Sequence, residues 1–314
     1  MSLLTFGDIK TAADRITGQI RPVTVAPVDS DALPGHIWLA LEFMQHTGSF
    51  KARGAANFIS AHLDAGTLPD TGVTIASGGN AGLACAWAAG RQGVRATVFL
   101  PQTAPEVKVA KLRGYGADVR LVGAEYAEAL AACEEFAATT GALASHAYDH
   151  PLIAAGAGTL VDEIRHQVPG LDTVVVAVGG GGLFAGVATA AHHHGVRVVA
   201  VEPARCRALN AAIEAKQVVD VEIDSVAADS LGARRTSTMA LQAARQGDMR
   251  SLLVPDEEIL RAREMLWDHR RLAVEHGAAT ALAALTGGVY TPGEEETVAV
   301  VLCGANTNPC TLAG

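Results

Sequence analysis

The stretch Thr47–Gly54, TGSFKARG, decides how the rest of the chain is interpreted. It places Lys51 in a short turn between two apolar segments, and residues 55–63 follow with a helix-like pattern. Burial lowers the pKa of a lysine, and Phe50 and the glycines on either side can enclose Lys51 in apolar, closely approaching backbone. A neutral amine in such a place can form an imine with an aldehyde cofactor. On its own the stretch would favour a surface lysine in a turn, and the motifs below reverse that interpretation.

A run of glycines predicts an anion-binding loop. Residues 178–183 read VGGGGL and lie between an apolar strand pattern and a helix pattern. Glycine lets backbone N–H groups converge on an anion, and the N-terminus of a helix adds a favourable dipole. The spaced GxGxxG pattern is missing, so a single phosphate fits better than a dinucleotide, with a plain strand-to-helix turn as the alternative. The candidate phosphate contacts are Gly179, Gly180, Gly181, Gly182 and Leu183.

Two other strand ends carry small or polar side chains. Residues 76–82, ASGGNAG, place Asn80 where its amide and nearby backbone N–H groups can meet a carboxylate or a ring hydroxyl, unless Asn80 only caps a helix. Residues 300–306, VVLCGAN, place Cys303 at the end of an apolar strand, where a buried structural cysteine is the alternative. Both segments are candidates for a small-molecule site.

The order of the elements predicts the fold class. From residue 73 onward, β-branched runs alternate with alanine-rich segments of helical period, which is typical of parallel strands joined by crossover helices. The expected strands are 73–77, 96–100, 118–122, 173–178, 196–202, 252–254 and 297–303. The expected helices are 81–92, 106–114, 125–140, 152–167, 183–194, 257–270 and 278–285. The predicted class is α/β.

These elements fall into two groups. The break lies near residues 146–151, where the segment from Tyr148 to Pro151 predicts a turn into a helix started by proline. We expect two open, mostly parallel α/β lobes: a small substrate-side domain over residues 73–144, and a large domain over residues 1–72 and 145–314. No repeat or long linker is visible, and we expect no appended regulatory domain.

Composition and charge argue for a globular protein and against certain partners. The chain has 314 residues, of which 49% are hydrophobic and 18% charged, and this composition suits a buried α/β core. A net charge of −9 and a pI near 5.6, with scattered basic residues, argue against nucleic acid and anionic membranes as partners. Residues 1–20 hold several charges and no apolar run long enough for a signal or a membrane span, so we expect a cytoplasmic protein.

The signals for disulfides and metals are weak. Five cysteines, at positions 85, 133, 206, 303 and 310, are an odd number at irregular spacing, which argues against a disulfide framework or a zinc site. The adjacent histidines His192 to His194 precede Gly195 and fit a solvated helix end better than a metal site, because adjacent helical side chains point in different directions. We expect no metal at these cysteines or histidines.

Together the motifs resemble the serine and threonine dehydratase family, pyridoxal-phosphate enzymes with the fold type of the tryptophan synthase β subunit (fold type II). The resemblance covers most of the chain. It implies that Lys51 holds pyridoxal 5'-phosphate and later acts as general base, that Asn80 bonds the ring oxygen, and that Cys303 stands opposite the pyridine nitrogen. The implied cofactor contacts are Lys51, Phe50, Asn80, residues 179–183 and Cys303, and the implied substrate contacts are Ser77, Gly78, Gly79 and Ala81.

Three positions refine this resemblance. Serine racemases of the same fold carry a serine where Gly78 stands, and glycine has no proton to give to the opposite face of Cα, so we expect little racemisation. A neutral Cys303 thiol gives little help in keeping the pyridine nitrogen protonated, which favours prompt loss of a β-substituent. Glu202 is a candidate cation ligand, but Ala208 replaces the aspartate of metal-activated racemases, so we expect a monovalent ion or none.

The resemblance implies a lyase that dehydrates L-threonine or L-serine to a 2-oxo acid and ammonia, working as a homodimer on a small amino acid. Asp149, Thr159 and Asp229 are expected to pack or cap rather than to catalyse. A hydroxyaspartate dehydratase, a serine racemase or a β-replacement enzyme such as a cysteine synthase would use the same cofactor. From other classes, a nucleotide-binding reductase or a catalytically silent amino-acid-binding protein could use similar glycine loops. The preference between serine and threonine stays open, because one methyl group is a modest energy difference.

Overall fold

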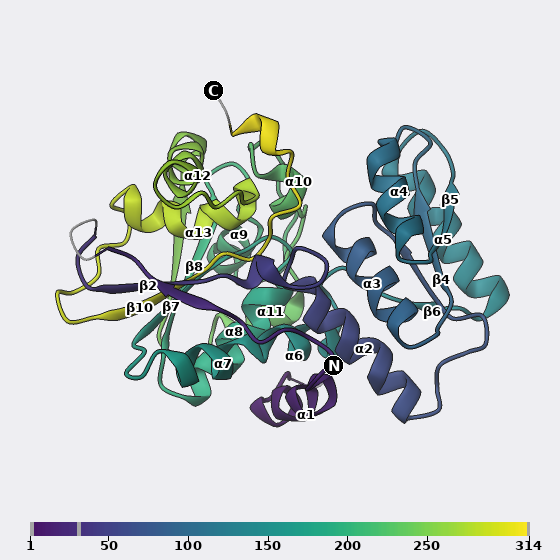
Figure 1. The fold of residues 1–314 in the computed structure, drawn as a ribbon, viewed down its shortest axis with the longest axis horizontal. Helices are drawn as coiled ribbons and strands as arrows, with labels where there is room; N and C mark the ends of the chain where they lie inside the picture. The colour runs from purple at the N-terminus through teal and green to yellow at the C-terminus, as the bar shows by residue number, and fades with distance from the viewer. Residues whose placement is uncertain (1–2, 30–32, 313–314) are drawn as a thin grey trace.

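The computed structural model describes residues 3–29 and 33–312, and it contains two β-sheets surrounded by helices (Figure 1). The larger sheet, on the left in Figure 1, has six strands. In spatial order they are β1 (Val25–Pro27), β2 (His36–Ala40), β10 (Thr297–Val301), β7 (Thr173–Ala177), β8 (Arg197–Pro203) and β9 (Met249–Val254). The smaller sheet, on the right, has the order β5 (Asp118–Leu121), β4 (Ala96–Leu100), β3 (Val73–Ala76) and β6 (Leu143–Ala144). All neighbouring strands pair in parallel except β1 and β2.

The centre of the larger sheet is buried on both faces, as its valine-rich strands require. Every residue of β7 is buried, and β10 pairs with it in parallel. Because neighbouring parallel strands end at the same edge of a sheet, the glycine loop after β7 and Cys303 after β10 leave that edge side by side.

Thirteen α-helices and two short 3₁₀ helices are described. The α-helices are α1 (Phe6–Ile16), α2 (Lys51–Asp64), α3 (Asn80–Arg91), α4 (Glu106–Gly114), α5 (Tyr126–Thr140), α6 (Pro151–Gly158), α7 (Leu160–Gln167), α8 (Gly182–His193), α9 (Ala208–Ala215), α10 (Ala228–Leu231), α11 (Thr238–Ala243), α12 (Asp256–Arg270) and α13 (His276–Thr286). The 3₁₀ helices are η1 (Glu42–Met44) and η2 (Pro309–Thr311). No helix in the described ranges is long and apolar enough to cross a bilayer.

The α/β class and the main alternation of elements are confirmed. The expected strand 96–100 and the expected helix 106–114 have the observed bounds, and most other predicted elements differ by a few residues at their ends. The prediction did not include α1, β1, β2, β6 or the helices α9 to α11. These missed elements are mostly short or lie before residue 73, where no alternating pattern was recognised.

The placement of Lys51 in a turn before a helix over residues 55–63 is wrong. Helix α2 begins at Lys51 itself and continues to Asp64. Gly54, expected to enclose the lysine, instead lets two helices approach: a Cβ on Gly54 would lie 2.7 Å from the backbone oxygen of Ile153 in α6. Helix α2 packs against α6 on one side and against α3 on the other (Figure 1).

The single helix expected over residues 152–167 is also wrong, because the chain forms α6 and α7 with Thr159 between them. The Thr159 hydroxyl donates to the backbone oxygen of Gly156 at 2.8 Å and accepts a hydrogen bond from Arg53 of α2 at 3.0 Å. Helix α6 does begin with proline after His150, as the turn at residues 148–151 predicted.

Candidate active site

Lys51 combines a position at the start of a helix with partial burial. Its Nζ donates a hydrogen bond to the backbone oxygen of Ala147 at 3.0 Å and lies 4.7 Å from the centroid of the Phe50 ring. Burial lowers the pKa of Lys51 from 10.5 to about 8, although the nearby Cys303 and Glu275 side chains oppose this shift. The neutral, nucleophilic form of the amine is therefore well populated near pH 8.

Asn80 belongs to a polar network that the sequence did not reveal. It is the first residue of α3, and its Nδ2 donates to both carboxylate oxygens of Glu275, at 2.9 and 3.0 Å. Asn306 donates from its own Nδ2 to the Oδ1 of Asn80 at 2.7 Å and from its backbone nitrogen to Glu275 at 2.8 Å. The alternative that Asn80 only caps α3 is wrong, because Gly79 is the N-cap residue and the Asn80 side chain bonds to Glu275 and Asn306.

Glu275 is the centre of this network. It is 8% exposed, and burial raises the pKa of its carboxyl, while hydrogen bonds from Asn80 and Asn306 oppose the rise. A Cβ on Gly304 would lie 2.6 Å from Glu275 Oε2, so that only glycine fits beside the carboxylate. Asn306 also donates to the backbone oxygen of Thr47 at 2.7 Å, and this bond joins the network to the loop before Lys51.

The glycine loop leaves no room for side chains. A Cβ on Gly180 would lie 2.4 Å from ring carbons of Tyr148, and one on Gly181 would lie 2.4 Å from Cβ of Ala240. Gly181 also has φ = 92°, in the left-handed region that favours glycine. The next residue, Gly182, opens α8, whose first N–H groups have no partner within the helix. This cradle of bare backbone at a helix N-terminus fits the phosphate of pyridoxal 5'-phosphate.

One short segment joins the lysine to the glycine loop. The backbone oxygen of Ala147 accepts the hydrogen bond of Lys51, and the next residue, Tyr148, packs over the loop. A Cβ on Gly182 would lie 2.7 Å from the backbone oxygen of Tyr148. The Tyr148 hydroxyl donates to the backbone oxygen of Arg235 at 3.3 Å. An amine and an anion cradle therefore adjoin the same two residues, as a cofactor with an aldehyde and a phosphate requires.

The expected substrate segment turns tightly from β3 into α3. The Ser77 hydroxyl accepts a hydrogen bond from the backbone nitrogen of Gly79 at 3.4 Å, and Ala81 is buried in the first turn of α3. A Cβ on Gly78 would lie 2.8 Å from Cδ2 of Leu100, so a larger residue there would require the leucine to move. The segment ends at Asn80 and is thereby connected to Glu275.

Cys303 lies just after β10, 6% exposed, and its backbone oxygen accepts a hydrogen bond from the backbone nitrogen of Phe50 at 2.9 Å. Burial, together with the nearby Glu275 carboxylate, raises the pKa of the Cys303 thiol to about 12. The thiol is therefore neutral at physiological pH, and it lies beside the residues that position Lys51.

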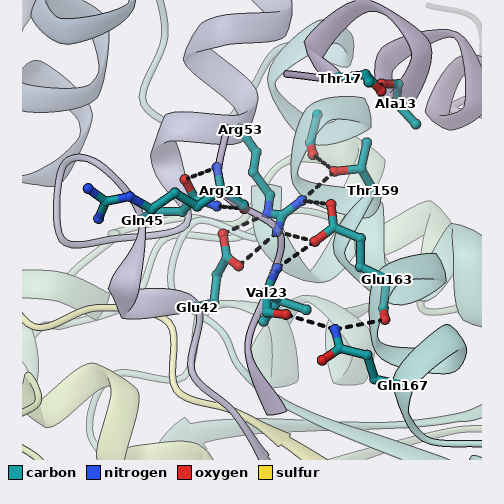
Figure 2. Close-up of polar contacts among 11 residues, drawn as sticks. Ala13, Thr17, Arg21, Val23, Glu42, Gln45, Arg53, Thr159, Glu163 and Gln167 are labelled. Atoms are coloured by element: carbon teal, nitrogen blue, oxygen red, sulfur yellow. Dashed lines mark hydrogen bonds and ion pairs between the residues drawn. The ribbon is translucent and has the colours of Figure 1, made fainter. Parts of the chain in front are cut away.

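A second buried cation lies two residues after Lys51. Arg53 is completely buried and contacts two carboxylates (Figure 2). Its guanidinium donates to Glu42 at 2.6 and 2.9 Å and to Glu163 at 2.6 and 2.8 Å. Burial opposes the charge, but Glu42 and Glu163 raise the pKa of Arg53, so the guanidinium stays charged. The Arg53 cluster, defined as Arg53, Glu42, Glu163 and Thr159, joins α2 to η1 and α7.

The remaining candidates lie outside this constellation. Glu202 is fully buried, and its carboxylate accepts hydrogen bonds from the backbone nitrogens of Leu209 and Asn210 at 2.8 and 2.7 Å, in the first turn of α9. Asp229 lies in an exposed ion pair with Lys108, with N···O 3.4 Å, rather than in packing or a cap. Within the described parts of the chain, no group of three or more His, Cys, Asp or Glu side chains is placed to hold a metal ion.

The structure therefore brings Lys51, Phe50, Asn80 and Cys303 together, with the glycine loop joined to them through residues 147 and 148. Glu275 and Asn306 are the members that the sequence analysis missed. Glu275 follows an apolar residue and precedes an alanine-rich helix, a context without any distinctive spacing. Asn306 stood at the end of the quoted segment VVLCGAN, but only Cys303 was singled out there.

Comparison with known proteins agrees with this geometry. Residues 16–304 match the family of pyridoxal-phosphate dependent enzymes. The chain belongs to that family. It is similar to a protein named L-threonine ammonia-lyase from Geobacter sulfurreducens, with 34% identity over 99% of this chain and 78% of the relative. A serine dehydratase-like protein of Rattus norvegicus is also 34% identical, over 86% of this chain and 85% of the relative.

Solved structures of pyridoxal-phosphate dependent enzymes share the fold. The crystal structure of serine racemase from Dictyostelium discoideum matches with a TM-score of 0.90 and 28% identity, over 98% of this chain and 100% of that one. The family membership and this match confirm the predicted two-lobed α/β fold and the predicted cofactor, pyridoxal 5'-phosphate.

Proposed function

We propose that this pyridoxal-phosphate dependent enzyme is an ammonia-lyase that converts L-threonine or L-serine to a 2-oxo acid and ammonia. The names of its relatives, L-threonine ammonia-lyase and serine dehydratase-like, support this activity. The observation that carries the proposal is Lys51, a half-buried amine with its pKa lowered to about 8, adjoining a phosphate cradle.

Different residues of the chain have different roles in the proposed reaction. When bound, pyridoxal phosphate supplies a ring that withdraws electrons from the substrate Cα. In our proposal, Lys51 would hold the cofactor and, as a neutral amine, would take the proton from the substrate Cα. The glycine loop would hold the phosphate, Phe50 and Cys303 would contact the ring, and Asn80 would bond the ring oxygen. Ser77, Gly78, Gly79 and Ala81, at the N-terminus of α3, receive the substrate carboxylate.

Racemisation is the second candidate, because solved racemases share the fold with a TM-score of 0.90. Gly78 supports the lyase. A racemase needs a proton donor on the face of Cα opposite Lys51, and a glycine at this position carries none. A Cβ at position 78 would lie 2.8 Å from a terminal methyl of Leu100, so another side chain there would require this leucine to move.

The family resemblance also supports proposals for the roles of the two domains, the oligomeric state and the cellular location. We propose that residues 73–144 form the substrate-side domain and that residues 1–72 and 145–314 form the cofactor domain. We also propose a homodimer in the cytoplasm, on the strength of the family resemblance. Light scattering of the purified protein tests the assembly, and cell fractionation tests the location.

A substrate panel tests the activity. L- and D-serine, L- and D-threonine and threo-3-hydroxyaspartate are each supplied to the purified holoenzyme, and oxo acid and ammonia are both quantified. We expect equal amounts of the two products from L-threonine or L-serine, and no change in product when sulfide is added. D-serine formed from L-serine faster than pyruvate would contradict the lyase and support the racemase. Product formation by a Lys51→Ala variant at the wild-type rate would contradict both.

A further inference from the structure

Thr236 carries a buried hydroxyl with no hydrogen-bond partner within the described ranges. The residue is 2% exposed and lies in the loop before α11. Its Oγ1 is 2.7 Å from the position that a Cβ on Gly181 would occupy, so the hydroxyl lies directly against the glycine loop. Buried hydroxyls in native proteins almost always have a partner, because an unmatched one loses its water without compensation.

The neighbouring contacts hold the segment that carries this hydroxyl against the glycine loop. The backbone nitrogen of Ser237 donates to the backbone oxygen of Gly180 at 3.0 Å, which ties the segment to the loop. The Ser237 hydroxyl already accepts the N–H of Ala240 at 3.1 Å as the N-cap of α11. Thr236 is thus the residue of this segment whose hydroxyl is unused, and it adjoins the one loop glycine with a positive φ, Gly181.

We propose that the Thr236 hydroxyl donates a hydrogen bond to the phosphate of bound pyridoxal 5'-phosphate, as a side-chain donor added to the backbone donors of residues 179–183. The inference rests on the proposed role of the glycine loop and adds to it a residue from a different part of the chain. A phosphate offers several acceptor oxygens, and a hydroxyl bonded to an anion makes one of the stronger hydrogen bonds in proteins. The unmatched buried hydroxyl thereby acquires its partner when the cofactor binds.

A Thr236→Val variant removes the hydroxyl and keeps the shape. The cofactor is first removed from the holoenzyme. Pyridoxal phosphate, or pyridoxal, which lacks the phosphate, is then titrated into the cofactor-free protein, and binding is followed by absorbance. We expect the dissociation constant for pyridoxal phosphate to rise about 10-fold or more, because a hydrogen bond to a charged group is lost. The constant for pyridoxal should stay within about twofold of wild type, and Thr236→Ser should restore tight binding of pyridoxal phosphate.

Thr189→Val is the matched control. Thr189 is also buried, and its hydroxyl donates to Ala185 at 2.8 Å within α8. Losing that bond should leave the affinities for both cofactor forms unchanged. Denaturation of the cofactor-free proteins provides a second readout: Thr236→Val should be at least as stable as wild type, and its gain in melting temperature on adding pyridoxal phosphate should be smaller.

The outcomes separate this inference from the proposed function. Unchanged affinity of Thr236→Val for pyridoxal phosphate, or an equal loss for pyridoxal, would overturn the role of Thr236. If Thr236→Val does not fold, the ³¹P chemical shift of bound cofactor decides: a shift identical in wild type and Thr236→Ala overturns the inference, and a changed one supports it. Wild-type turnover by Lys51→Ala would instead overturn the proposed function, and the comparison of the two cofactor forms would still stand.

Discussion

Two cations lie two residues apart on α2, and their surroundings differ completely. Arg53 has no exposed surface and is paired with two carboxylates, which hold it charged. Lys51 donates to a backbone oxygen, and burial lowers its pKa to about 8. The difference teaches that burial alone does not determine the state of a charge: the partner does. A paired cation fixes the helix, and a cation bonded only to a neutral oxygen is ready for proton transfer.

The largest expected difference between the two sites is in turnover. Lys51→Ala should lower kcat/KM by roughly 10³-fold or more, because the variant lacks the amine that we propose as the general base. Folding stability should not fall, since the variant no longer buries an ammonium. Oxo-acid assays and urea denaturation measure the two effects, and Lys111→Ala, at an exposed position on α4, is the control. Turnover within tenfold of wild type would remove Lys51 from the mechanism.

Arg53 should show the opposite behaviour. Arg53→Met leaves the fully buried Glu42 and the partly exposed Glu163 without their cation and should destabilise the fold by about 3 kcal/mol or more. Urea denaturation measures the loss. Arg113→Ala, which breaks an exposed pair with Glu106, should change stability by less than about 1 kcal/mol. A loss that small in Arg53→Met would mean that the cluster contributes little to the fold.

The pH dependence of cofactor uptake and of folding stability tests whether Lys51, unlike Arg53, loses its proton near pH 8. Since Lys51 is protonated below a pKa of about 8, the rate at which cofactor-free protein takes up pyridoxal phosphate should fall about tenfold per pH unit below that value. In the unfolded chain the lysine keeps its proton up to about pH 10.5, so the unfolded state binds more protons between 8 and 10.5 and stability rises with pH in that window. Lys51→Met should lack this rise. A rate independent of pH between 6 and 8 would contradict the lowered pKa.

The smallest expected effect comes from Glu275. Its negative charge raises the pKa of Lys51, so Glu275→Gln should move the midpoint of cofactor uptake to lower pH, by less than about one unit. The same titration of uptake rate against pH measures this shift. Glu134→Gln, at an exposed position on α5, should leave the midpoint unchanged. A midpoint that moves to higher pH would mean that Glu275 acts on Lys51 through something other than its charge.

The sequence predicted elements whose patterns are local. Strand 96–100 and helix 106–114 have the expected bounds because proline and glycine mark their ends: Pro101 follows the strand, Pro105 precedes the helix and Gly114 ends it. The start of α2 was missed because residues 47–54 were interpreted as a turn in which Gly54 helps to enclose Lys51, whereas Gly54 serves the contact with α6. At the break between α6 and α7, the Thr159 hydroxyl accepts a hydrogen bond from Arg53, which is 106 residues earlier in the chain, and no local pattern predicts such a contact.

The same reasoning applies to the site. Lys51, the glycine loop and the residues around Asn80 were found because each lies in a distinctive string of residues. Glu275 has no such string, and its importance comes from Asn80, 195 residues away. Thr236 likewise carries no sequence signal, because only the folded chain brings its hydroxyl against Gly181. Distant contacts of this kind add residues to the candidate site that no local pattern in the sequence indicates.

The central claim is that Lys51 is the lysine to which the cofactor attaches. Borohydride reduction of the holoenzyme, followed by proteolysis and mass spectrometry, tests it most directly. We predict the added mass of the reduced cofactor on the peptide that contains Lys51, and its disappearance in Lys51→Arg. The same mass on a different lysine of the wild-type protein, with the Lys51 peptide unmodified, would contradict the account.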